Sequence, residues 1–283
     1  MPIVSRRHFL TAAAASSAAS CNARTLKTVG VQLYTVRDVL PAKPAETLRM
    51  LADVGYREAE LVGATMEKIW PSLKQTPIKP VSVHLDTALF TRDQGELPAA
   101  LDDAKQRGLE YAVCPYIAPN DRGGIDVIRK LGEALNKAGE ICRKAGMKLC
   151  YHNHAFEFEP AAGGTLLDEL MRTADPKLVG LELDIMWAQV AGVPPVRVLE
   201  KYGQRVWLLH LKNVAPGIPE QYNEMVDRAA FREVGNGVID VPAVLNAAAK
   251  AGVKHYFVEQ DQTPGDPVAS LRRSFEYVSK LKY

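Results

Sequence analysis

The chain has 283 residues, 47% of them hydrophobic, and its 35 basic and 33 acidic side chains leave a formal net charge of only +2. This balance gives no basic stripe for nucleic acid, so we expect no nucleic-acid partner. Four cysteines without a CxxC spacing indicate neither a zinc ribbon nor a disulfide framework.

The N-terminus carries the pattern of a twin-arginine export signal. Arg6 and Arg7 precede a short, alanine-rich apolar stretch. We therefore predict a signal at residues 1–23, recognised by the twin-arginine export machinery. The mature protein is then expected to begin near Arg24 and to work in the periplasm or outside the cell, and lipidation of Cys21 is the weaker alternative. No other apolar stretch approaches membrane-spanning length, so we expect no membrane span.

Eight strand-like apolar runs then alternate with stretches of helical spacing. The predicted strands cover residues 28–35, 56–62, 80–86, 111–116, 147–152, 178–184, 206–212 and 255–260. The clearest helical stretches cover residues 45–54, 97–107, 125–145, 165–174 and 241–251, with a closing helix at 271–281. Eight repeats of this length favour a single α/β domain, a (β/α)8 TIM barrel over residues 24–283. An open dinucleotide-binding sheet is disfavoured, because no GxGxxG follows the first strand.

Polar residues stand at the far ends of several of these strands, where a buried strand should stay apolar. Residues two apart share a face of a strand, so His152 and His154 point together, as do His210 and Lys212. All strand ends of a parallel barrel meet at one mouth. The residues expected to converge there are His84, His152, His154, Asp184, His210 and Glu259. A converging set of imidazoles and carboxylates suits a divalent metal.

Two connections are longer than the repeat requires. Residues 156–164 follow the fifth strand, and residues 214–237, rich in proline and glycine, follow the seventh. Both come after strands with polar ends, where barrel enzymes place the loops that cover a substrate.

On these residues the chain resembles the sugar phosphate isomerase/epimerase superfamily, the xylose isomerase-like TIM barrels. Residues 31–38 look like its first strand, 55–61 like its second, and 235–240 like the turn before its last helix. Residues 151–158, which begin with the motif YHNH, are similar to a branch of secreted members. The resemblance covers nearly all of residues 24–283 and implies the same barrel fold.

The resemblance also implies a metal site with a glutamate on strand five, an aspartate on six, a histidine on seven and a glutamate on eight. Asp184, His210 and Glu259 match the last three, and His152 stands where the first glutamate would be. If His152 ligates, two imidazoles and two carboxylates suit Mn, Zn, Co or Fe better than Mg. The rival role for His152 is a hydrogen-bonded contact to the substrate.

The implied activity is that of an isomerase or epimerase that removes the proton next to a carbonyl of an unphosphorylated sugar or ketosugar. Glu259, His152 or His154 would take this proton, and Lys212 would hold the developing negative charge. The side chains expected to contact the sugar are His84, Glu157, Trp187 and Gln260.

The histidine at position 152 leaves a second activity open. Epimerases of this kind use two metal-bound glutamates on opposite faces of the sugar, so His152 weakens that scheme and gives weight to β-elimination from an inosose or a 3-keto-glycoside. An exported sugar-binding protein without chemistry is the non-enzymatic alternative. Glu182 is expected to face inward beneath Asp184 and to pair with a buried cation such as Lys212. The sequence makes no prediction of oligomeric state.

Overall fold

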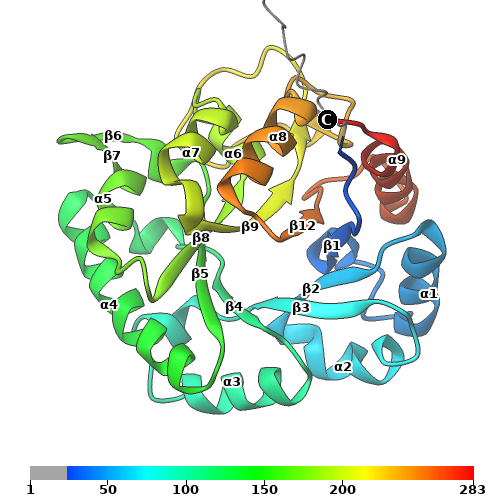
Figure 1. Ribbon diagram of the computed structural model, residues 1–283, viewed down its shortest axis with the longest axis horizontal. Helices are drawn as coiled ribbons and strands as arrows, with labels where there is room; N and C mark the ends of the chain where they lie inside the picture. The colour runs from blue at the N-terminus through cyan, green and yellow to red at the C-terminus, as the bar shows by residue number, and fades with distance from the viewer. Residues whose placement is uncertain (1–23) are drawn as a thin grey trace, which may run out of the picture.

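The computed structural model describes residues 24–283, and the export signal predicted at residues 1–23 lies outside them. Within the described residues, eight parallel strands close into a barrel in chain order, with the helices outside (Figure 1). The strands are β1 (Gly30–Gln32), β2 (Glu58–Val62), β3 (Lys79–His84), β4 (Tyr111–Cys114), β5 (Lys148–His152), β8 (Val179–Asp184), β9 (Val206–Leu211) and β12 (His255–Val258). The predicted (β/α)8 barrel is therefore confirmed.

The helices lie between the strands and cover the outside of the barrel. They are α1 (Pro44–Val54), α2 (Gly63–Leu73), α3 (Leu97–Gln106), α4 (Ile125–Lys144), α5 (Leu166–Thr173), α6 (Ile185–Val190), α7 (Pro195–Tyr202), α8 (Val241–Ala251) and α9 (Pro267–Lys280). All six predicted helical stretches coincide with helices. No helical range was predicted for α2, α6 or α7. Helix α2 begins with a glycine and contains Pro71, two residues that weaken a helical pattern.

The inside of the barrel changes from apolar to polar along its strands. Cys150, Leu208 and Phe257 belong to a small apolar cluster inside the ring. Two residues further along the same strands stand His152, His210 and Glu259, on the same face by alternation. The larger apolar core lies between the strands and the outer helices. The barrel thus supports its polar mouth on a packed apolar floor.

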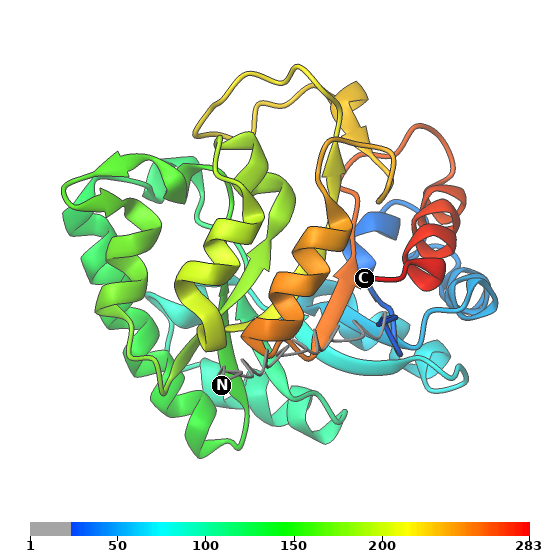
Figure 2. The same ribbon diagram turned by 45° about the horizontal axis from the view of Figure 1, so that its top comes forward.

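Both long connections contain short antiparallel strand pairs. β6 (Pro160–Ala161) pairs with β7 (Gly164–Thr165), and β10 (Asn213–Val214) pairs with β11 (Phe231–Arg232). The segment between β10 and β11, coloured yellow, stands above the barrel (Figure 2). It contains Glu224, whose Oε2 lies 2.9 Å from Arg122 Nη1 in the connection after β4. This ion pair ties the segment to the other loops of the mouth. Within residues 24–283, none of the helices has the length and apolar character needed to cross a bilayer.

Candidate metal centre and active site

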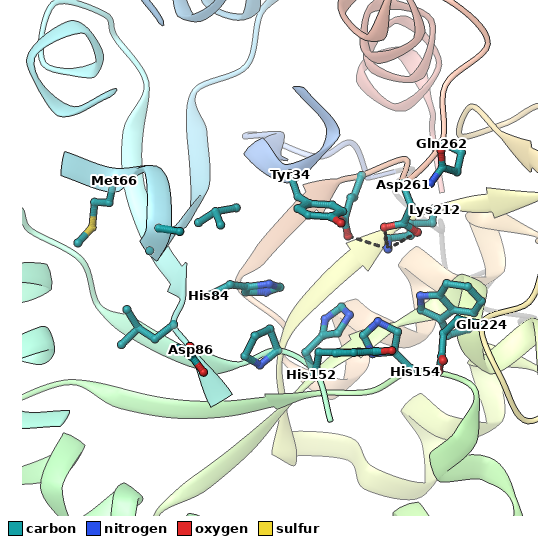
Figure 3. A pocket seen from close by; sticks show the side chains of 18 of the residues that line it. Tyr34, Met66, His84, Asp86, His152, His154, Lys212, Glu224, Asp261 and Gln262 are labelled. Atoms are coloured by element: carbon teal, nitrogen blue, oxygen red, sulfur yellow. Dashed lines mark hydrogen bonds and ion pairs between the residues drawn. The ribbon is translucent and has the colours of Figure 1, made fainter. Parts of the chain in front are cut away.

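A cavity of about 990 Å³ opens at the C-terminal ends of the strands. Its polar end lies where β5, β9 and β12 end, and Figure 3 shows the side chains that line it. They include His84, His152, His154, Lys212, Glu259 and Asp261. The predicted convergence of these strand ends is therefore observed for the histidines at 84, 152 and 154 and for Glu259. Asp184 and His210 are buried directly behind these lining side chains.

Three of the four predicted metal ligands lie within reach of one ion. Asp184, His210 and Glu259 can each offer one ligand atom such that all three atoms lie within 4.8 Å of one another. His210 Nδ1 lies 2.7 Å from Glu259 Oε2, and His152 Nε2 lies 3.7 Å from Asp184 Oδ2. This mixture of nitrogen and carboxylate donors is the set that first-row divalent metals take in proteins.

Asp184 has one oxygen held by the backbone and one that faces the site. As the N-cap of α6, it accepts hydrogen bonds at Oδ1 from the backbone N–H groups of Met186 and Trp187, at 2.9 and 3.1 Å. Oδ2 is buried and accepts no hydrogen bond from residues 24–283, although the Lys212 ammonium lies 2.9 Å away as an ion pair. A buried carboxylate oxygen left in this state has the capacity for a metal ligand bond, so the residues present fit a divalent cation.

Two buried glutamates lie behind the two imidazoles. His210 Nε2 lies 2.6 Å from Glu60 Oε1, and His152 Nδ1 lies 3.0 Å from Glu182 Oε2. In each ring the other nitrogen faces Glu259 or Asp184. Histidines that bind metals are commonly fixed in this way by a carboxylate on the second nitrogen. The pairing supports ligation through His210 Nδ1 and His152 Nε2.

His84 joins the two glutamates. Its Nε2 lies 2.9 Å from Glu60 Oε1 and 2.8 Å from Glu182 Oε2. His84, His152, Glu182 and His210 form a second combination that could hold a metal. The imidazole nitrogens of that combination already share Glu182 Oε2, whereas none of the described residues donates a hydrogen bond to Asp184 Oδ2. The group around Asp184 is therefore the better metal site, and the network of Glu60, His84 and Glu182 supports it from below.

The charges around the site set which imidazoles stay neutral. Burial, assisted by His210 and other cationic groups, holds the pKa of His152 well below its ordinary value, and burial does the same for His154. The neutral ring is the form that binds a metal or accepts a proton. Burial alone would lower the pKa of His84, but Glu60 and Glu182 raise it to about 9.

Lys212 lies among three carboxylates. Its Nζ is 2.9 Å from Asp184 Oδ2, 2.7 Å from Glu259 Oε2 and 2.9 Å from Asp261 Oδ2. Burial alone would lower the pKa of the Lys212 ammonium, yet these carboxylates, with Asp184 the strongest, raise it well above its ordinary value. The expected pairing of Glu182 with Lys212 is wrong, because Glu182 pairs with imidazoles instead. A carboxylate oxygen has room for more than one partner, so the ion pairs with Lys212 leave Asp184 and Glu259 able to bind a metal as well.

Two residues predicted to contact the substrate do not line the cavity. Glu157 is fully buried and lies outside the cavity lining; it accepts hydrogen bonds from Tyr151 Oη at 2.6 Å and from the backbone N–H of His154 at 2.8 Å. It therefore fixes the turn after β5. Gln260 is also buried outside the lining, because side-chain alternation turns it away from the face that Glu259 occupies.

The other predicted contacts lie at the cavity. Trp187 and His154 both line it, with ring centroids 5.6 Å apart. The ring centroid of Tyr116 lies 4.9 Å from that of His154. These rings form a wall on which a sugar face can stack. Two residues of the site were not among those predicted: Tyr116, and Asp261, which stands two residues after Glu259.

Comparisons with known proteins agree with this architecture. Residues 73–281 match the family model described as xylose isomerase-like TIM barrel. An inosose dehydratase of Geobacillus kaustophilus is 30% identical over 161 residues, which cover 53% of this chain and 52% of that protein. The chain thus spans about half the length of the curated relatives it matches.

Solved structures resemble the whole barrel. A sugar phosphate isomerase/epimerase from Parabacteroides distasonis has a TM-score of 0.72 at 24% identity, covering 89% of this chain and 94% of that one. The IolI protein with a bound zinc atom has a TM-score of 0.67 at 17% identity, covering 89% and 98%. The 3-keto-D-glucoside 4-epimerase of E. coli has a TM-score of 0.64 at 14% identity, covering 90% and 99%. At these identities the likeness concerns the fold.

Proposed function

Because this chain belongs to the xylose isomerase-like TIM barrel family, we propose that it is a metal-dependent lyase that carries out β-elimination on a ketosugar. The observation that carries the proposal is the composition of the polar end. Glu259 is the one predicted acid–base carboxylate there, and the position on β5 that would hold the second one is the imidazole of His152. Similarity to inosose dehydratases supports the same reaction type.

The metal would be held by Asp184, His210 and Glu259, with His152 as the fourth ligand. A divalent ion there would polarise the substrate carbonyl and stabilise the negative charge that develops when the neighbouring proton leaves. Nitrogen donors in this set favour Zn, Mn, Co or Fe over Mg. The bound zinc atom of IolI supports a metal of this kind.

The residues of the chain have distinct parts in the reaction. Glu259 reaches the cavity as a buried carboxylate. Burial alone would raise the pKa of Glu259, but Lys212 and His210 hold this pKa below its ordinary value. The carboxylate is therefore ionised and can accept the α-proton. Lys212 brings a fixed ammonium group that can donate a hydrogen bond to an oxygen gaining negative charge. His154 lines the cavity, its Nδ1 makes no hydrogen bond within the described part of the chain, and this nitrogen can accept one from a sugar hydroxyl. Trp187 closes the same side of the cavity.

Epimerisation is the second candidate, and one observation favours it. His152 and Glu259 reach the cavity from β5 and β12, which are separated by β8 and β9 in the ring. Two proton-accepting groups that approach from different strands could serve opposite faces of a sugar.

Incubation with candidate ketosugars and keto-glycosides in deuterated water tests both reactions. Release of water or of an aglycone supports elimination, whereas deuterium in a recovered or epimerised sugar without such release supports epimerisation. Asp184→Asn should lose both bound metal and activity. Asp240→Asn is the matched control, because Asp240 caps α8 much as Asp184 caps α6 but lies outside the cavity lining. Protein that binds sugar but holds no metal and shows no chelator-sensitive turnover would refute the enzyme proposal.

A further inference from the structure

The cavity is larger than a single sugar ring needs, and its polar groups gather at one end. Its volume of about 990 Å³ lies at the upper limit of the roughly 300–1,000 Å³ that is typical of sites for drug-sized ligands. Lys212 and Asp261 lie on one side of His84, while Met66 lies on the other side (Figure 3). The cavity therefore continues beyond the metal centre, towards α2 and α3.

This continuation is lined mainly by apolar side chains. We call it the apolar arm, and it is lined by Val62, Ala64, Met66, Leu85, Leu89 and Ala100. Gly63 lies at its inner end, where an added Cβ would come within 3.1 Å of Leu85 Cδ2 and 3.2 Å of the His84 carbonyl oxygen. The glycine thus permits close packing of α2 on the end of β3 beside the arm.

The charges along the apolar arm restrict what it can hold. Asp86 and Asp103 are the ionisable side chains that line this part of the cavity, and both are acidic. Asp103 is paired with Arg107 at 2.7 Å, but Arg107 is not part of the lining. The lysine and arginine that line the cavity, Lys212 and Arg228, both lie in the chain between β9 and β11, and none of the lining residues on β2, α2, β3 and α3 is a lysine or arginine. A phosphate or carboxylate there would lose its hydration without gaining a cationic partner.

We propose that the substrate is a glycoside, whose sugar ring lies at the polar end and whose neutral, apolar aglycone occupies the apolar arm. This inference rests on the proposed function, because the polar end is the part that would react with the sugar. The aromatic side chains of Tyr34 and Tyr116, both partly exposed, line the same mouth and would contact the ligand between its two parts.

The chemistry of such a substrate balances without another reagent. When the ketone lies two carbons from the anomeric centre, the base removes the proton from the carbon between them. The electron pair of that C–H bond becomes the new C=C bond as the glycosidic C–O bond breaks. The aglycone oxygen leaves with the bonding pair and takes up a proton, so no oxidant or reductant is consumed.

Binding of unreactive glycosides tests the apolar arm separately from catalysis. Phenyl and methyl glycosides of the same hexoses, in both anomeric forms and without a keto group, would be titrated into the metal-loaded protein by calorimetry. We expect the phenyl glycoside of at least one pair to bind about ten-fold or more tightly, because its ring leaves water for an apolar surface. Equal dissociation constants across all pairs would overturn the inference.

A substitution within the apolar arm locates the effect. Ala100→Trp should fill the arm and abolish the phenyl preference while leaving the dissociation constant of the methyl glycoside and the metal content unchanged. Ala99→Trp is the matched control on the same helix, since Ala99 is exposed and does not line the cavity. Ala64→Trp, on the facing wall, serves if Ala100→Trp does not fold. A phenyl preference that survives in the folded arm variants would refute the assignment.

The two proposals fail in different ways. If phenyl and methyl glycosides bind equally but a ketosugar still undergoes elimination, the apolar arm is refuted and the proposed function stands. If the phenyl preference is present but no proton exchange or release occurs with any keto-glycoside, the proposed function fails while the arm is supported. If no glycoside of the series binds, the glycoside inference is refuted, and the deuterium experiment decides the activity.

Discussion

Substitution of Glu182 by glutamine should weaken metal binding although Glu182 is not itself a proposed ligand. The carboxylate accepts contacts at Oε2 from His152 Nδ1 at 3.0 Å and from His84 Nε2 at 2.8 Å. Glutamine keeps the size but removes the charge that fixes the His152 ring with Nε2 towards Asp184. Loss of such a partner costs about 10–100-fold in metal affinity, or about 1.4–2.8 kcal/mol at 1.4 kcal/mol per factor of ten.

Competition with a chelator of known affinity for zinc or cobalt measures this change directly, without any assay of activity. The second half of the prediction concerns the background of His152→Glu, which restores the carboxylate expected from the resemblance. There Glu182→Gln should cost less metal affinity, because no imidazole at position 152 is left for Glu182 to orient. Glu233→Gln is the control, since Glu233 is largely buried but bonds to Arg273 outside the cavity lining. An unchanged affinity in Glu182→Gln, or the same loss in both backgrounds, would refute the reasoning.

Three further predictions concern stability. Removal of bound metal with a chelator should lower the melting temperature, and added Zn or Mn should restore it, because a ligand of the native state stabilises that state. Lys212→Met should lower the free energy of unfolding by about 3–5 kcal/mol, because three carboxylates lose the ammonium group that lies 2.7–2.9 Å from each of them. Urea titration measures this free energy. Burial raises the pKa of Glu157 to about 8 in the folded protein, above its ordinary 4.5. The stability this group contributes is therefore full below pH 4.5 and is lost as the pH rises to about 8, so Glu157→Gln should show a smaller decline in melting temperature from pH 5 to 8.

Each stability prediction has a result that would contradict it. A melting temperature that is indifferent to chelator and to added metal would argue against a cation at the mouth. A Lys212→Met protein as stable as the parent would mean that the three carboxylates are not ionised together. Parallel pH profiles for the parent and Glu157→Gln would show that Glu157 does not carry the shifted proton.

Strand alternation explains why much of the site could be predicted from the sequence. Residues two apart at the ends of β5, β9 and β12 had to share the inner face, and the barrel brought those ends together. The same rule places Gln260 on the other face from Glu259, so its position outside the cavity lining could have been predicted. The position of Glu157 could not be predicted in this way, because Glu157 lies in the short 3-10 helix Phe156–Phe158, where strand alternation no longer applies.

The network beneath the metal site could not be predicted in detail. Glu182 was predicted to face inward, but the partners of Glu182 and Glu60 depend on the register between strands. In the barrel, His152 stands beside Glu182 and Asp184 beside His210 in adjacent strands. Sequence alone does not state this register. Similarly, Gly63 and Pro71 weakened the helical pattern of α2, although tertiary packing of Met66, among others, stabilises that helix.

Lys212 gives the barrel mouth a permanent counter-ion. Asp184, Glu259 and Asp261 are brought together by chain folding itself, and the ammonium group that offsets their mutual repulsion is part of the same chain. We therefore expect the barrel to close before any metal arrives, unlike a zinc finger, whose folding depends on its ion. Folding and metal uptake become separate events in time. The identity of the bound metal is then determined by the metals available to the finished protein, together with the donor atoms of its mouth.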